Sequence, residues 1–178
     1  MRVSKPGKSG FTLVEVLVVV TIMGVLSTMG VVSLRSAVIN TRIKDAGINV
    51  TAYMQRAANE AIRMNTKLCV VAVGKKILTY KAECGTDPAA ANLGSAIDQM
   101  ELEAANAFVS TYNNCPDGGT RFANNMVTIT PKVGVSPIPA GCFIVQYGTT
   151  DRMAASVRQS TKYAMYYKLS YDSGSSWF

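Results

Sequence analysis

The sequence has 178 residues, 48% of them hydrophobic, and a formal net charge of +7 at pH 7. This length favours one domain plus one unusual segment. The chain contains no histidine, which excludes chemistry that depends on an imidazole as general base or metal ligand. Three basic residues lie in the first ten, and the net charge is +4 without them. A mildly basic chain permits an acidic partner but does not require one.

The chain begins with a short basic segment, "MRVSKPGKSG", which is broken by a proline and a glycine. From Phe11 to Leu34 the only charged residue is Glu15. As an α-helix this run would extend about 36 Å, enough to cross a hydrocarbon core of about 30 Å. Basic residues before a span hold that end in the cytoplasm. We therefore expect the rest of the chain to lie across the membrane.

The position of the small residues predicts an unusual cleavage site. An ordinary signal peptide has a shorter apolar core, followed by small residues at the cut. Here "SG" precedes the apolar run. A cut between Gly10 and Phe11 would keep the span and create an α-amine, which is cationic near neutral pH.

This amine would explain the acidic residue in the span, because a carboxylate at bilayer depth costs about 2.5–3.5 kcal/mol. Glu15 lies four residues after Phe11, so its own amine could pair with it across one helical turn. The amine of a neighbouring chain could pair with it as well and would fix the register between packed helices. The alternative is a glutamate that reaches the interface of a plain membrane anchor.

The stretch "GFTLVEVLVVVTIMGVL" resembles the N-terminus of type IV pilins and of type II secretion pseudopilins. The matching residues are Gly10, Phe11, Thr12, Leu13 and Glu15, followed by an apolar run. The resemblance implies that a prepilin peptidase cuts after Gly10 and N-methylates Phe11. It also implies that the N-terminal helices stack into a filament, with Glu15 and Thr12 acting in assembly.

The second half of the span departs from the pattern of major pilins, which often carry a proline there. This chain has Val31 and Val32, with Gly24 and Gly30 as the weaker points of the helix. The difference favours a minor pilin or pseudopilin over a major pilin.

Helical spacing of apolar residues continues over residues 35–65, with charged residues between them. A single helix from about Phe11 to Met64 would measure about 80 Å, and Gly47 would be a soft point in it. The stretch "YMQRAANEAIRMNTKLCVVAV" is similar to the helix end and first strand of the GspH/FimT group of minor pilins and pseudopilins.

The remaining chain predicts mostly strands. Residues 68–73 and 77–80 flank a Gly-Lys-Lys turn and predict a β-hairpin. The alanine-rich stretch that follows predicts a loop with a short helix, from Ser95 to Ala107 at most. Further strands are predicted in "NNMVTITPKV", in "GCFIVQYGT" and in the aromatic C-terminal stretch.

We therefore expect an α+β pilin fold, in which a long N-terminal helix packs on a mostly antiparallel sheet. The predicted divisions are a cleaved leader, a transmembrane and assembly helix, an amphipathic helix of the head and a β-rich head, at residues 1–10, 11–34, 35–65 and 66–178.

The four cysteines form no CxxC pair. An even number after an export-type segment favours two disulfides in an oxidising compartment, with free buried thiols as the alternative. Four cysteines allow three pairings. We favour Cys69–Cys84 and Cys115–Cys142, because each pair is close in sequence.

We find no nucleotide-binding, zinc-protease or serine-hydrolase motif, and expect no catalytic residue, cofactor or metal. The acidic residues Asp98, Glu101 and Glu103 predict a solvated surface.

A basic stretch near the C-terminus interleaves cations with tyrosines and could bind DNA. Its candidate residues are Arg152, Arg158, Lys162 and Lys168. The favoured alternative is a strand with an aromatic core face and a basic outer face.

The expected function is a non-enzymatic minor pilin of a type IV pilus, which primes assembly or lies near the tip. The alternatives are, in order, a type II secretion pseudopilin of the GspH type, a DNA-binding minor pilin for natural transformation, and a membrane-anchored periplasmic enzyme. The expected partners are other pilin or pseudopilin subunits, the prepilin peptidase and the inner membrane, with DNA as a further candidate. We expect the chain in the bacterial inner membrane with its head in the periplasm, and afterwards in a pilus or pseudopilus.

Overall fold

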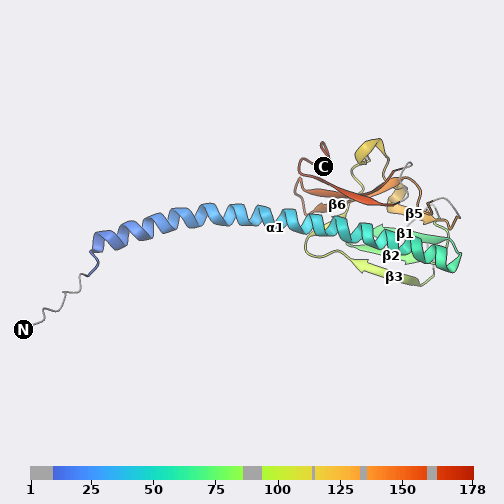
Figure 1. Cartoon of the computed structure of the whole chain (residues 1–178), viewed down its shortest axis with the longest axis horizontal. Coiled ribbons are helices and arrows are strands. Elements are labelled where there is room, and N and C mark those ends of the chain that lie inside the picture. Colours follow the sequence, from blue (N-terminus) through green and yellow to red (C-terminus); the bar gives the residue numbers. More distant parts are fainter. Residues whose placement is uncertain (1–9, 86–93, 114, 133–135, 160–163) are drawn as a thin grey trace, which may run out of the picture. The chain divides into compact units, whose positions relative to one another are not determined.

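The computed structural model describes residues 10–85, 94–113, 115–132, 136–159 and 164–178 (Figure 1). It divides into two units, Met1–Val38 and Ile39–Phe178. One helix, α1 (Leu13–Met64), contributes to both units. The predicted leader lies almost entirely outside the described residues.

The first unit consists of the N-terminal part of α1. The Glu15 N–H donates to Thr12 Oγ1 at 3.2 Å, and the Val16 N–H donates to the Thr12 carbonyl at 3.2 Å. Threonine followed three residues later by glutamate is the pattern of a capping box. The helix therefore begins at Leu13, two residues later than predicted, because Thr12 caps it.

The second unit contains two four-stranded sheets within the described residues, with strand orders β3-β2-β1-β5 and β4-β6-β7-β8. Every strand pair in them is antiparallel. The strands of the first sheet are β1 (Leu68–Val73), β2 (Lys76–Tyr80), β3 (Ala96–Glu101) and β5 (Met126–Ile129). Those of the second are β4 (Asn106–Phe108), β6 (Gly141–Tyr147), β7 (Met153–Arg158) and β8 (Tyr166–Ser170). Two short 3-10 helices, Pro116–Gly118 and Ala123–Asn125, precede β5.

The structure confirms the α+β architecture and most of the predicted strands. β1 and β2 form the predicted hairpin, with Val73 opposite Lys76 and Cys69 opposite Tyr80. Gly74 takes a φ of +58° in its turn, a conformation that suits glycine. β5, β6 and β8 lie in the three other stretches that predict strands.

The prediction of a short helix between Ser95 and Ala107 is wrong. These residues form β3 and most of β4 instead. β3 pairs with β2, with Glu101 opposite Lys76 and Gln99 opposite Leu78. The open edge of β2 overrides the helix preference of an alanine- and glutamate-rich stretch, because strand formation depends mainly on the neighbours that a segment finds.

Within the second unit, one face of α1 packs into the main core. Ile43, Val50, Met54 and Ala61 lie on this face at helical spacing and are fully buried. They pack with residues of both sheets, such as Val70, Ile129 and Phe143, which belong to the same core cluster. Residues 39–64 of α1 therefore hold the two sheets together.

Gly47 is a packing position and not a soft point. A Cβ atom added there would lie 3.0 Å from the Ala154 Cβ on β7 and 3.5 Å from the Tyr167 Cβ on β8. The helix is continuous through it. Glycine at this position lets the backbone of α1 approach the second sheet closely.

Both predicted disulfides are present. Cys69–Cys84 joins β1 to the segment after β2, with 4.9 Å between the Cα atoms. Cys115–Cys142 joins the segment before the first 3-10 helix to β6, with 5.9 Å between the Cα atoms. All four cysteines are thus paired as the sequence suggested.

Candidate functional site

The Gly10–Phe11 bond lies in exposed, non-helical chain directly before α1. Both residues are exposed, and a Cβ added at Gly10 would meet no atom within 4 Å. A peptidase acts on accessible chain that is not folded into a helix. The geometry at this bond therefore fits the predicted cleavage site.

The first unit presents a continuous apolar surface. In α1, an 18-residue window has a mean hydropathy of 2.3, and none of that window is buried. Every described side chain from Phe11 to Val38 is exposed. An apolar surface of this size requires cover by lipid or by other apolar helices. Within the described residues, α1 is the one helix long and apolar enough to cross a membrane.

Glu15 is the single charged residue in the apolar part of this helix. Its backbone N–H is bound by Thr12, and its side chain is exposed. No ion pair of Glu15 occurs among the residues that the structure describes. Because Phe11 precedes the helix, the uncut chain does not place Phe11 and Glu15 one turn apart on one helix.

The N-terminal part of the chain matches a known sequence motif. Residues 5–31 match the family model described as the prokaryotic N-terminal methylation motif. This motif is the prepilin signal of type IV pilins and pseudopilins, and the matched residues include Gly10, Phe11 and Glu15.

The match and the α+β fold together support the broad class of type IV pilin-like and pseudopilin subunits. A subunit of this class is structural, is anchored in the inner membrane by its apolar helix, and interacts with the prepilin peptidase and with other subunits. No curated protein and no solved structure matches the chain.

Among the described residues predicted to bind DNA, Arg152 and Arg158 lie at opposite ends of β7. Arg158 is only 8% exposed; its Nε donates to Ser136 Oγ at 3.2 Å, and its Nη1 donates to the Gln159 carbonyl. Arg152 precedes the other end of β7, about 20 Å away along an extended chain.

The guanidinium of Arg152 lies over the Tyr171 ring, 4.8 Å from its centre. Lys168 is half-buried opposite Ala155, and Lys162 lies outside the described residues. The burial of Arg158 contradicts its assignment as a surface contact for phosphate.

The acidic residues of β3 and the loop after it are ion-paired or exposed. Asp98 pairs with Arg56, and Glu101 lies 3.8 Å from Lys76. Glu103 is exposed. The described residues include no group of three or more histidine, cysteine or acidic side chains that could hold a metal ion.

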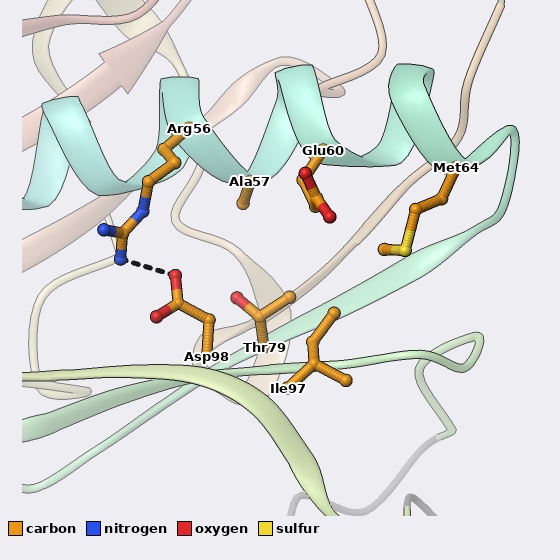
Figure 2. Close-up of a pocket in the computed structure, with 7 residues that line it drawn as sticks. All are labelled: Arg56, Ala57, Glu60, Met64, Thr79, Ile97 and Asp98. Atoms are coloured by element: carbon orange, nitrogen blue, oxygen red, sulfur yellow. Dashed lines mark hydrogen bonds and ion pairs between the residues drawn. The ribbon is translucent and has the colours of Figure 1, made fainter.

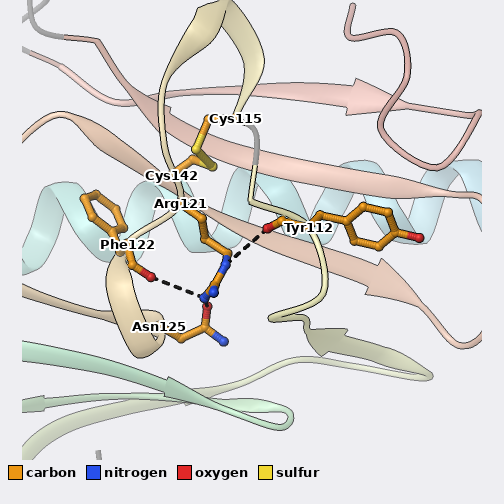
Figure 3. The surroundings of a disulfide bond; sticks show 6 residues. All are labelled: Tyr112, Cys115, Arg121, Phe122, Asn125 and Cys142. Atoms are coloured by element: carbon orange, nitrogen blue, oxygen red, sulfur yellow. Dashed lines mark hydrogen bonds between the residues drawn. A yellow bond between two sulfur atoms is a disulfide. The ribbon is translucent and has the colours of Figure 1, made fainter. Parts of the chain in front are cut away.

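Arg121 is a structural residue that the sequence did not single out (Figure 3). Its Nε donates to the Tyr112 carbonyl at 3.1 Å, and its Nη1 donates to the Phe122 carbonyl and to Asn125 Oδ1 at 3.2 and 2.7 Å. These bonds hold the segment around the Cys115–Cys142 disulfide. No local sequence pattern marks an arginine whose partners are carbonyls fixed by a disulfide-bonded loop.

Proposed function

We propose that this chain is a non-enzymatic minor pilin of a type IV pilus. A prepilin peptidase cuts it after Gly10 and N-methylates Phe11. The helix that begins at Leu13 first anchors the chain in the inner membrane, with the head in the periplasm, and then enters the filament, where the subunit primes assembly or lies near the tip. The observation that supports this proposal most strongly is a matched prepilin signal on the apolar first part of α1, residues 13–34, in which every described side chain is exposed and Glu15 is the single carboxylate.

The helix leaves the bilayer when sister helices replace lipid around it. Lipid tails are as apolar as valine and leucine side chains, so apolar burial alone does not favour one register of the helices. A carboxylate in this environment costs about 2.5–3.5 kcal/mol when it is unpaired. Pairing of Glu15 with the Phe11 amine of a neighbouring subunit removes that cost in one register.

The helix cap formed by Thr12 helps to decide whether Glu15 pairs with the Phe11 amine of its own chain or with that of a neighbouring subunit. Thr12 begins the helix and leaves Phe11 outside it. An amine on Phe11 would thus extend from the helix end, where a neighbouring chain can reach it. The proposal therefore assigns the amine to a neighbour and assigns to Thr12 the role of holding the helix start.

Incorporation of Glu15→Gln and Glu15→Ala chains into filaments tests the proposal. Filaments are sheared from cells, and the fraction of the chain in them is compared with the fraction in the membrane. We expect normal insertion and cleavage and a loss of incorporation of about tenfold or more, because a neutral side chain leaves the cationic amine of the neighbouring subunit unpaired in apolar surroundings.

Val20→Ala is the matched control, since it alters an exposed residue of the same span and changes no charge. Normal incorporation of Glu15→Gln would contradict the pairing. Recovery of the wild-type chain only with type II secretion components would make it a pseudopilin and not a minor pilin.

A further inference from the structure

A groove runs between α1 and β3 in the second unit, Ile39–Phe178, which is the head of the molecule. Three adjoining cavities, with volumes of about 300, 340 and 360 Å³, lie between the helix from Arg42 to Met64 and the strand. The second and third cavities share Asn49 and Met100, and the first and third share Arg56. We call the three cavities together the α1–β3 groove; Figure 2 shows the end that includes Met64.

The groove follows the backbone edge of β3. Its lining contains every residue from Ile97 to Glu103. Successive side chains of a strand point to opposite faces, so a lining of consecutive residues indicates the edge of the strand. β3 is the outer strand of its sheet and, among the described residues, pairs only with β2.

Side chains form hydrogen bonds with two main-chain groups of β3, the Gln99 N–H and the Asp98 carbonyl. The Asp98 carboxylate accepts the Gln99 N–H at 2.9 Å and pairs with Arg56 across the groove (Figure 2). The Tyr53 hydroxyl donates to the Asp98 carbonyl at 3.1 Å and contacts Thr79 Oγ1. Burial raises the pKa of Tyr53 to about 12, so this hydroxyl stays protonated at neutral pH.

The ion pair between Arg56 and Asp98 is the weaker of the contacts across the groove. Arg56 and Asp98 are both substantially exposed, and an exposed ion pair of this kind contributes little to stability. It can open when another chain competes for the edge.

The groove is acidic in a chain that is basic overall. Its lining has five acidic and two basic side chains, a net charge of −3, whereas the whole chain carries +7. Glu60, Asp98 and Glu101 are ion-paired, with Arg63, Arg56 and Lys76. Asp45 and Glu103 are the lining carboxylates that take part in no ion pair among the described residues. Apolar surface from Met64 and Ile97 lies at one end. The side chains of Glu101 and Glu103, at the other end, are exposed.

We propose that the α1–β3 groove binds an extended peptide segment of a partner protein, with lysine or arginine alternating with apolar residues, as an added strand beside β3. The main chain of the segment would pair with the β3 edge, and the groove would select its side chains. Alternation sets apolar residues on the α1 side and cations on the side of Glu101 and Glu103. β3 has six residues, so the matching segment is about six residues long.

This proposal goes beyond the function of the N-terminal helix and does not depend on it. The test uses the full chain in a non-ionic detergent and the probe peptide acetyl-(Lys-Val)₃-amide. Binding is followed by NMR of the backbone amides. We expect saturable binding that weakens with salt, with the largest shifts at Ala96–Glu101.

Two control peptides separate strand addition from charge attraction. The first has the same side chains but N-methylated backbone nitrogens, so it lacks the N–H donors that a strand needs. The second replaces each lysine by glutamate. We expect neither peptide to bind detectably.

Two matched variants locate the site. Glu101 and Glu83 have side chains that are 62% and 61% exposed, and each is paired with a lysine, but only Glu101 lines the groove. We expect Glu101→Lys to weaken probe binding about fivefold and Glu83→Lys to leave it unchanged. Unchanged amide spectra away from each substitution verify that both variants are folded.

Three outcomes would overturn the proposal. Equal binding of the N-methylated peptide would show charge attraction without strand addition. An equal effect of Glu83→Lys would show attraction to the whole surface. The absence of saturable binding by the probe would show that the groove does not accept this kind of segment.

Discussion

Gly47 shows how one residue sets the distance between α1 and the second sheet. Its backbone is helical, so its conformation does not require glycine. The requirement comes from Ala154, whose Cβ would lie 3.0 Å from an added Cβ. Neither atom belongs to a flexible side chain, so relief would need a shift of the helix or the strand.

Gly47→Ala should lower the free energy of unfolding of the head by about 1 kcal/mol. Overpacking costs about 1–3 kcal/mol, which exceeds the gain of about 1 kcal/mol in helix propensity. Urea unfolding in detergent measures the effect.

The double variant Gly47→Ala with Ala154→Gly should show a favourable coupling energy, since it removes the clashing methyl group. An increase in stability for Gly47→Ala alone would contradict the close packing.

The lowered pKa of Asp172 should make the stability of the head depend on pH. Hydrogen bonds from Ser176 and Ser170 hold the pKa of its carboxyl group at about 2, below the ordinary 3.8. A group whose pKa is lower in the folded state stabilises that state above its unfolded pKa. This contribution should be present above pH 3.8 and should be lost as the pH falls through about 2.

Asp172→Asn should flatten the dependence of head stability on pH in that window, measured by unfolding at several pH values. Glu103→Gln, which alters an exposed carboxylate, is the control. If Asp172→Asn and the wild-type chain lost stability in parallel, the hydrogen bonds would not bear on folding.

At the scale of elements, local sequence predicted the strands that carry their own signals. The β1–β2 hairpin has two apolar runs around a glycine turn, and β6 is an apolar run that follows a glycine. β3 has no such signal, because Ala96–Glu101 is rich in residues that also favour helices. Its alternating burial appears only once β2 lies beside it.

The candidate site residues differ in how far the sequence alone can predict them, because some depend on local order and others on the folded structure. Gly10, Phe11 and Glu15 are recognisable in the sequence because the methylation motif that residues 5–31 match is defined by the order of residues along the chain. Arg158 was placed on a basic surface, but β7 turns it inward to Ser136. Charge along the sequence does not reveal which face of a strand a residue occupies.

The Cys115–Cys142 disulfide should stabilise the head more than its position at a loop suggests. It closes a separation of 27 residues, and both cysteines are buried in a core cluster with β6 and β7. Replacing both cysteines by alanine should lower the free energy of unfolding by about 2–4 kcal/mol.

The same paired substitution at Cys69 and Cys84, which closes 15 residues, gives the comparison. Urea unfolding of both variants measures the two costs. A loss below about 1 kcal/mol at Cys115 and Cys142 would mean that the Arg121 bonds hold the segment without the disulfide.

At the scale of the whole molecule, the two units have different requirements for partners. Residues 39–64 of α1 find their apolar contacts within the head. The earlier part of α1 has none of its described side chains buried, so it depends on lipid or on other helices. The proposed function requires this part of α1 to exchange its contacts with lipid for contacts with the helices of other subunits.

In the proposed function, the cut after Gly10 would permit that step, because it would create the amine that pairs with Glu15. The intact mass of the chain recovered from assembled filaments tests this claim most directly. The account predicts a chain that has lost Met1–Gly10 and gained one methyl group on Phe11. An assembled chain that retains its leader, or one cut after the apolar run so that the head lacks its helix, would contradict it.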